Sequence, residues 1–400
     1  MALLFLAPAH LTGGHSQRWP FRHPTAPRPF PAPDGAPAPT PVERTPMPIP
    51  TEPIGSVPRP LELITGFQDH AEGRIDSTAL RELTDAALAD TVSRMAATGS
   101  PVVTDGEQDK PSFLTYPVAG IPDLSPDGAV VPFADGHTRQ LPVLTSGPFR
   151  YAARAVDQLR ATRRLTDLPV KQAVIAPSAL SLLYPADGIE GYPRERFLAD
   201  LADEAEADIR TCLEAGADSV QLDFTEGRLS LKLDPSGGLL RDFTALITTV
   251  LARFSAEERA RIGVHTCPGG DQDSTHSADV DYAELLPTLF AVPAGRFYVQ
   301  LASEPDRKRT LAVIRDHLPA GARVFVGVVD PIDPRVETAE EVRDRVLEAA
   351  EFIPLEQLGT CDDCGFAPFA DDTSTSRDTA FAKIAARVEG TRLAAEALGA

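Results

Sequence analysis

The chain has 400 residues, a hydrophobic content of 42% and a formal net charge of −20. The length and apolar content suffice for one large core, while the excess of acid argues against nucleic acid or an anionic membrane surface as a partner. No apolar run reaches the roughly 18 residues of a membrane span, and four cysteines in so long a chain favour a reducing, cytoplasmic location over a disulfide scaffold.

Residues 1–46 differ in composition from everything that follows. They contain 11 of the 38 prolines and the only tryptophan, Trp19. A Pro- and Ala-rich segment with few aliphatic side chains buries too little apolar surface to offset the entropy of ordering, so it is predicted to be a disordered tail. An alternative is that the protein begins at Met47. The folded domain is expected over residues 47–400.

Short apolar runs alternate with longer segments of helical period over the rest of the chain. The predicted strands are 52–56, 101–105, 170–175, 219–223, 262–265, 297–301, 324–329 and 357–360. The clearest helical patterns cover 77–99, 193–216, 239–255 and 339–354, with Gly or Pro near their expected ends. Residues 113–144 interrupt this rhythm with Pro, Gly and short apolar runs, which predicts an inserted hairpin.

Eight strand–helix units predict an α/β protein with a (β/α)₈ TIM barrel, the alternative being a doubly wound open sheet. Catalytic residues of such barrels lie at the carboxyl ends of the strands. Polar residues of this chain gather at those positions: Ser56, Asp105, Glu107, Asp223, His265, Cys267, Glu304, Asp330 and Cys364.

His265 and Cys267 end one of the predicted strands. Side chains two apart on a strand point to the same side, so the imidazole and the thiol can reach a common point. Both groups are common zinc ligands, although a buried His and a buried Cys are more often packing residues. Glu304 and Cys364, after later apolar runs, extend the set to four candidate ligands for a zinc ion.

Several motifs together resemble a known family. In chain order, "IPTEPIGSVPRP", "VVTDGEQ", "SVQLDF", "GVHTCPGG" and "DDCGFAPF" are similar to the catalytic barrel of cobalamin-independent methionine synthase and its shorter single-barrel relatives. The resemblance runs from about residue 49 to the C-terminus. The large family members have a second, amino-terminal barrel, for which this chain has no room.

The resemblance implies a zinc ion held by His265, Cys267, Glu304 and Cys364. For the glutamate, Gln300 occupies the other register, and Glu304 is favoured because a carboxylate is a better zinc ligand than an amide. Cys361 is not part of the family pattern, and with Cys364 it forms a CxxC that also allows a redox role or an alternative ligand.

The resemblance also implies how an amino-acid thiol is held. Ile54, Gly55 and Ser56 match the segment that faces the substrate carboxylate, and Glu107 and Asp223 match the two acids that take the α-ammonium group and act in catalysis. An ammonium group is a sensible partner for buried carboxylates, although both acids also fit ordinary strand ends.

This chain departs from the family pattern around the methyl donor. The loop "VVDPIDPR" lacks the family's histidine, so its proton-donating role is missing or passes to Asp330 or Asp333. The tryptophan on which folate stacks is absent, and Tyr184 is only a partial substitute. Phe224 and Thr225 stand where the family has an acidic residue and a proline. The donor is therefore left open between folate, a corrinoid protein and another alkyl donor.

We therefore expect a zinc-dependent methyltransferase that activates a thiol, homocysteine or a similar one, for attack on a donor such as 5-methyltetrahydrofolate. Metal binding turns a thiol into a thiolate near neutral pH. An alternative within the family is alkyl or epoxide transfer to another thiol. Glu107 and Asp223 speak against a sulfonate thiol. A purely structural zinc site disagrees with ligands scattered through the chain, and metal-free decarboxylase relatives would not need His265 or the cysteines.

Overall fold

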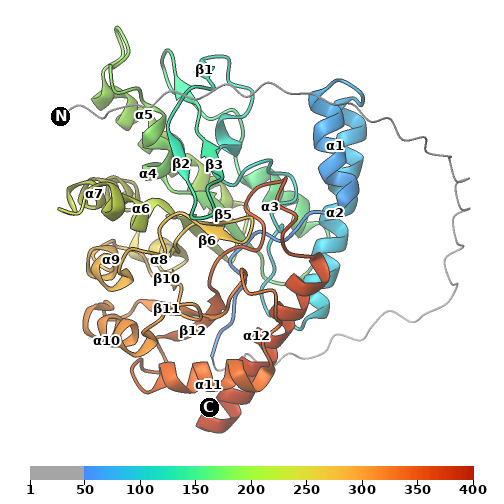
Figure 1. The fold of residues 1–400 in the computed structure, drawn as a ribbon, viewed down its shortest axis with the longest axis vertical. Helices are drawn as coiled ribbons and strands as arrows, with labels where there is room; N and C mark the ends of the chain where they lie inside the picture. Colours follow the sequence, from blue (N-terminus) through green and yellow to red (C-terminus); the bar gives the residue numbers. More distant parts are fainter. Residues whose placement is uncertain (1–48) are drawn as a thin grey trace, which may run out of the picture. The chain divides into compact units, whose positions relative to one another are not determined.

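The computed structural model describes residues 49–400, so the predicted tail over residues 1–46 lies outside the described residues. Six parallel strands form its main sheet, in the order β12-β11-β10-β7-β6-β5 (Figure 1). These strands are β5 (Lys171–Ile175), β6 (Ser219–Asp223), β7 (Ile262–Thr266), β10 (Arg296–Val299), β11 (Arg323–Val329) and β12 (Leu358–Asp362). They are buried along nearly their whole length, as strands covered on both faces must be.

Two further segments extend this sheet at its edges and complete the predicted (β/α)₈ barrel. Thr51 pairs with Thr360 of β12, and Val103 pairs with Val170 next to β5, both in parallel. The two segments are joined to each other where the Val57 N–H donates to the carbonyl of Gly106 at 3.1 Å. The strands expected over 52–56 and 101–105 are thus reduced to single bridges, since the prolines in and beside them lack the N–H that a longer ladder requires.

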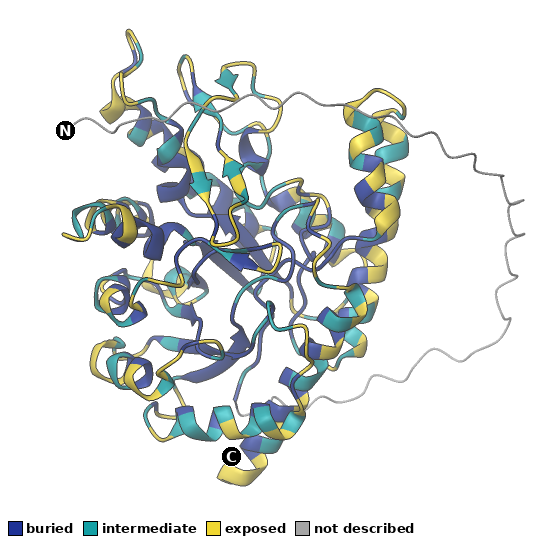
Figure 2. Ribbon diagram, in the orientation of Figure 1, coloured by how far each residue is buried: buried dark blue, intermediate teal, exposed yellow. Residues whose placement is uncertain are grey.

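Helices follow the strands and cover the outside of the barrel (Figures 1 and 2). They are α1 (Leu61–Ala71), α2 (Ser77–Ala97), α3 (Val156–Arg163), α4 (Pro177–Leu180), α5 (Arg194–Glu214), α6 (Glu226–Leu233), α7 (Gly238–Leu251), α8 (Ala256–Arg259), α9 (Tyr282–Leu289), α10 (Arg307–His317), α11 (Ala339–Ala350) and α12 (Arg377–Leu398), with short 3₁₀ turns at Tyr116–Val118 and Ser181–Leu183. The four helices predicted most clearly are confirmed as α2, α5, α7 and α11. Asp76 and Thr338 begin α2 and α11 by accepting backbone N–H groups, as expected of N-caps.

The inserted segment between the second strand position and α3 is confirmed as a hairpin. Its inner pair is β2 (Val130–Pro132) with β3 (Thr138–Gln140), enclosed by β1 (Leu124–Ser125) with β4 (Val143–Leu144), both antiparallel. A smaller antiparallel pair, β8 (Gly270–Asp271) with β9 (Ser274–Thr275), lies in the loop after β7. The carbonyl of Thr275 accepts the N–H of Ala134 at 2.9 Å, so the hairpin is attached to that loop.

The barrel interior is more polar than an aliphatic core. The Tyr298 hydroxyl donates to Glu52 at 2.6 Å, and Lys171 Nζ lies 4.0 Å from the centre of the Tyr298 ring. Lys171 also donates to Gln221 Oε1 at 2.8 Å, while burial lowers its pKa to about 8. These partners satisfy groups that would otherwise be costly to bury.

Candidate active site

A cavity of about 480 Å³ lies where the carboxyl ends of the strands meet the inserted hairpin. Residues from the strand ends form one part of its wall: Ile54, Ser56, Glu107, Asp223, His265 and Cys364. The hairpin supplies the opposite part, including Val131, Phe133 and Arg139. Ligand sites of (β/α)₈ barrels occupy this end of the strands, so the cavity is the candidate active site.

Three of the four predicted metal ligands come together beside this cavity. Ligand atoms of His265, Cys267 and Cys364 all lie within 4.8 Å of one another. The two sulfur atoms are 3.1 Å apart although 97 positions separate the residues in the chain. Both ring nitrogens of the buried His265 lack a hydrogen-bond partner among residues 49–400. An unpartnered buried imidazole beside two thiols fits a zinc-binding site, because Cys sulfur and His nitrogen are preferred zinc ligands.

The pKa values of the two thiols are shifted in opposite directions. The neighbouring Cys267 thiol holds the pKa of Cys364 well below its ordinary value, against the effect of burial, and contact with His265 lowers it further. The contact with Cys364, together with burial, raises the pKa of Cys267 well above its ordinary value. The pair therefore favours one thiolate, which is the form in which cysteine binds metal.

Glu304, the fourth predicted ligand, stands outside this group of three. Its Oε1 accepts from Arg228 at 2.7 Å and from the Gln300 amide at 2.9 Å. Gln300 in turn has a buried Oε1 without a partner among the described residues. The turn that carries these residues is fixed by Asp363, whose carboxylate accepts the N–H groups of residues 301–303 at 2.7–2.8 Å.

Cys361 does not join the metal-binding group. It lies inside the barrel, where it packs with Ile54, Tyr298 and Phe325, and its thiol donates to the carbonyl of Phe325 at 3.4 Å. Successive residues of β12 point to opposite sides. The CxxC spacing therefore does not bring the Cys361 thiol to that of Cys364, and all four cysteines of the chain are free thiols.

Ile54, Gly55 and Ser56 lie against the loop after β12. The Ser56 hydroxyl accepts the N–H of Ala367 at 3.3 Å, and the Ser56 carbonyl accepts that of Phe366 at 3.0 Å. A Cβ on Gly365 would come within 2.2 Å of the Ser56 Oγ, so this close approach requires glycine. The segment predicted to face a substrate carboxylate is thereby fixed next to Cys364.

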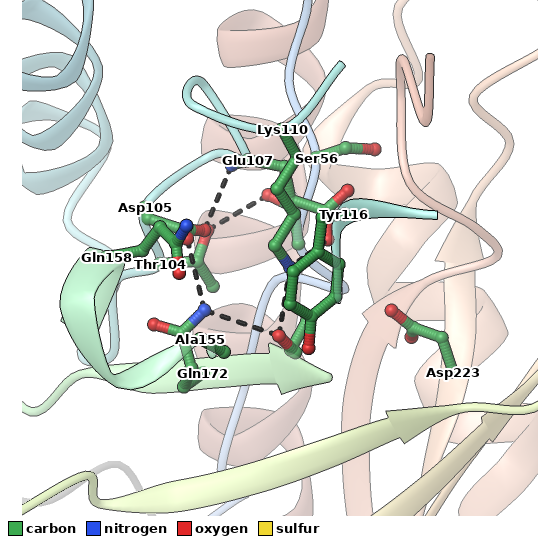
Figure 3. A network of polar contacts seen from close by, with 12 residues as sticks. Ser56, Thr104, Asp105, Glu107, Lys110, Tyr116, Ala155, Gln158, Gln172 and Asp223 are labelled. Carbon is green, nitrogen blue, oxygen red and sulfur yellow. Dashed lines mark hydrogen bonds and ion pairs between the residues drawn. The ribbon is translucent and has the colours of Figure 1, made fainter. Parts of the chain in front are cut away.

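Glu107 is held by a network of buried polar groups (Figure 3). Its backbone has a φ of +57°, unusual for a residue other than glycine, and its N–H donates to Asp105 at 2.9 Å. Its carboxylate accepts from Lys110 at 3.0 Å, and Lys110 also donates to the carbonyl of Ala173 at 2.9 Å. Sequence reasoning missed Lys110, which already supplies Glu107 with a cation. Burial raises the pKa of Glu107 to about 7, with Lys110 opposing this effect.

Asp223 lines the same cavity and lies apart from the network around Glu107 (Figure 3). It ends β6, paired in register with His265 of β7, and its Oδ1 accepts from Gln221 at 2.7 Å. Burial raises the pKa of Asp223, and the imidazole of His265 opposes that effect. One acid with a lysine partner and one without thus line the same cavity.

The three residues that the sequence suggested as substitutes on the methyl-donor side are not part of the cavity wall, although Thr225 is. Asp330, Asp333 and Tyr184 are absent from its lining, and the Tyr184 hydroxyl donates to the carbonyl of Tyr192 instead. Glu226, which sequence reasoning passed over, does line the cavity. Its only sequence signal is an acid three residues after Asp223.

The hairpin is attached to the barrel by charged groups that the sequence did not single out. Arg139 pairs with Asp271 at 2.5 Å and with Asp371 at 2.9 Å, and His137 contacts Asp271 at 3.1 Å. Phe133 packs edge-on against His276 of the loop after β7. These contacts hold the hairpin over the cavity.

Comparison with known proteins matches residues 49–386 to the family model described as the catalytic domain of cobalamin-independent synthase. A curated methionine synthase of Saccharolobus solfataricus is 23% identical over 352 residues, covering 88% of this chain and 96% of that relative. A 5-methyltetrahydropteroyltriglutamate–homocysteine methyltransferase of Streptomyces coelicolor is 26% identical over 328 residues. A similarly named enzyme of Aeromonas salmonicida is 23% identical, and the chain spans about 40% of its length.

Solved structures show the same fold. A B12-independent methionine synthase from a Shewanella species, in complex with selenomethionine, has a TM-score of 0.68 at 20% identity, covering 88% of this chain and 98% of that one. A putative enzyme of the same kind from Listeria monocytogenes has a TM-score of 0.60. A family described as cobalamin-independent gives no support to the corrinoid-protein donor. None of the helices in residues 49–400 has the length and apolar character needed to cross a membrane.

Proposed function

The chain belongs to the family of cobalamin-independent synthase catalytic domains, and on that premise we propose that it transfers a methyl group from a methylated folate to the thiol of homocysteine. The observation that carries the proposal is the meeting of His265, Cys267 and Cys364 beside a cavity with acids on its wall. A metal site that would activate a thiol and acids that would bind an amino acid then lie at the same cavity.

The proposed metal is zinc, held by His265, Cys267 and Cys364. Three protein ligands are the usual number at a catalytic zinc, where one position remains for water or substrate. Zinc bound there would supply a lowered pKa to the thiol of the acceptor, so that a thiolate is available near neutral pH. Asp223, paired in register with His265, would contact the substrate beside the imidazole.

We propose that Glu304 would be the fourth residue to hold the zinc, and the one that would leave room for the substrate thiol. In the structure its carboxylate rests on Arg228, and the Gln300 amide donates to the same oxygen. Arg228 and Gln300 would give the carboxylate a partner when it does not hold the metal, so the buried charge would not be left without one. Gln300, with its unpartnered Oε1, is the alternative ligand.

The acceptor amino acid would lie between the Ile54–Ser56 segment and the two acids. Backbone and hydroxyl groups of Gly55 and Ser56 suit a carboxylate, while Glu107 and Asp223 suit an α-ammonium group. Asp223 is the stronger candidate for the ammonium contact because Glu107 is already neutralised by Lys110. The Lys110 charge then keeps Glu107 from adding a second uncompensated negative charge to the cavity.

The deciding experiment supplies zinc-loaded protein with homocysteine and 5-methyltetrahydropteroyltriglutamate carrying a labelled methyl group. Labelled methionine is expected from the unaltered protein and not from Cys364→Ser. Cys212→Ser is the matched control, because Cys212 is a buried cysteine on α5 outside the cavity. Absence of labelled methionine from zinc-loaded, folded protein would contradict the proposal.

A further inference from the structure

Glu226 is a buried acid in the cavity wall that no role described so far uses. It begins α6, three residues after Asp223, and is 4% exposed. Neither carboxyl oxygen has a hydrogen-bond partner among residues 49–400, and no cation pairs with it within that range. A buried polar group with nothing to bind calls for an explanation, and its place in the cavity lining points to a ligand.

The other acids of the cavity wall differ from Glu226 in having partners. Glu107 pairs with Lys110 at 3.0 Å, Asp223 accepts from Gln221 at 2.7 Å, and Asp371 pairs with Arg139 at 2.9 Å. Each of these carboxylates has a donor or a cation that opposes the effect of burial on its charged form, although burial still raises the pKa of Glu107 and of Asp223.

Among the described residues Glu226 has no cation partner, so burial favours its neutral form. Burial raises its pKa to about 8; the charge of Asp223 adds to this, while Ser178 acts in the opposite direction. Asp223 is the charged group among the described residues that acts on it. A carboxyl group that is mostly protonated at neutral pH can give up a proton during a reaction.

Methyl transfer from a tertiary amine requires such a proton. As the sulfur lone pair forms the new S–C bond, the C–N bond breaks and its electron pair remains on the nitrogen of the donor ring. That nitrogen takes up one proton, and the group that provided it becomes an anion. The acid must therefore be protonated before the reaction and must face the cavity.

We propose that Glu226 is the acid that protonates the leaving nitrogen of the methyl donor. This role rests on the proposed methyl transfer and gives the donor a location in the part of the cavity near α6. The Glu226 O–H bond breaks as the N–H bond forms, and a proton from solvent restores the acid after the product leaves. Asp330 and Asp333, suggested by the sequence for this role, are absent from the cavity wall.

The test compares zinc-loaded wild type, Glu226→Gln and the matched control Glu257→Gln, whose side chain is exposed on α8. Glutamine keeps the shape of the side chain but has no acidic proton. Single-turnover formation of methionine is expected to fall about 10²–10⁴-fold in Glu226→Gln at pH 7, with the affinity for the donor changed only a few-fold. The wild-type rate should decline above about pH 8, and that of Glu226→Gln should show no such decline.

A second measurement does not depend on turnover. The infrared C=O stretch of protonated Glu226 should appear at pH 7 in the difference spectrum of wild type minus Glu226→Gln, and it should fade as the pH passes about 8. Wild-type turnover by a folded, zinc-loaded Glu226→Gln, or a carboxyl signal that is identical in that variant, would overturn the role of Glu226. No turnover by wild type, with the carboxyl signal present, would instead overturn the proposed methyl transfer.

Discussion

The sulfur atoms of Cys267 and Cys364 lie 3.1 Å apart, at the ends of strands β7 and β12 that do not neighbour each other in the sheet. Only a barrel that curves its strand ends around a shared centre brings them so close. With His265 they form a compact site whose buried imidazole lacks another partner within the described chain.

The first prediction concerns this site directly. Cys364→Ser should lower zinc affinity by about 100-fold or more, since a thiolate ligand is replaced by a poor one. Zinc content after dialysis against a chelator, read by elemental analysis, should fall well below one per chain. Cys212→Ser should keep its zinc. Equal zinc retention by both variants would contradict the proposed metal site.

Glu304 should behave as an exchangeable ligand rather than a permanent one. Glu304→Gln should keep zinc but weaken its binding about 10–100-fold, less than Cys364→Ser does. Competition with a chromophoric chelator measures both affinities. Glu257→Gln serves as the control. An unchanged affinity in Glu304→Gln would assign the fourth position to Gln300 or to solvent.

The buried pair of Glu107 and Lys110 should matter for stability. Both side chains are almost fully buried, at 3% and 1% exposure. Lys110→Met should lower the free energy of unfolding by about 3–5 kcal/mol because it leaves a buried carboxyl group without its partner. Urea denaturation measures this, with Lys308→Met on the exposed face of α10 as control.

The double variant Lys110→Met with Glu107→Gln tests the reason for that loss. Removing the orphaned charge should restore part of the stability. The two losses of unfolding free energy, from Lys110→Met and from Glu107→Gln, should not simply add in the double variant. If they do add, the two side chains do not interact.

Glu226 should make stability depend on pH. Its pKa is about 8 in the folded protein and 4.5 for an unperturbed glutamate, so its contribution is fully present below about pH 4.5 and is lost as the pH rises through 8. Glu226→Gln has no such titration. Its stability relative to wild type should therefore rise between pH 5.5 and pH 9, by as much as several kcal/mol.

Urea denaturation at the two pH values measures this difference, and Glu257→Gln should show none. A difference between Glu226→Gln and wild type that is the same at pH 5.5 and pH 9 would mean that Glu226 titrates as an ordinary exposed acid.

Arg139 should hold the hairpin over the cavity. Arg139→Ala removes charged hydrogen bonds to Asp271 and Asp371, each worth about 1.5–3 kcal/mol when partly buried. Hydrogen exchange over residues 124–144 should become at least about tenfold faster, with zinc content unchanged. Arg315→Ala, which breaks an exposed pair on α10, is the control. Unchanged exchange in the hairpin would show that other contacts hold it.

Local sequence patterns predicted the alternating elements well. Apolar runs identified the six strands of the main sheet, and the helical period, with Gly or Pro near the expected ends, located α2 and α11. The first two strands were predicted too long, because hydrophobicity does not register the prolines that limit pairing at Thr51 and Val103.

The candidate site was predicted in part. His265 and Cys267 could be paired from their spacing alone, and Cys364 could be added because it follows a later apolar run. The Glu304 carboxylate accepts a hydrogen bond from Arg228, a residue 76 positions away in the chain. Glu107 and Lys110 are close in the chain, but their pairing depends on the left-handed backbone conformation of Glu107. No pattern in the sequence predicts that conformation.

By itself, the sequence of this protein determined which residues are strands, which are helices, and which chemically active side chains stand at strand ends, because these properties depend on neighbours within a few positions. The tertiary structure alone decided which of those side chains meet, which acid has a cation and which has none. Burial and ion pairing arise from segments distant in the chain, and they set the charge that each group carries in the cavity.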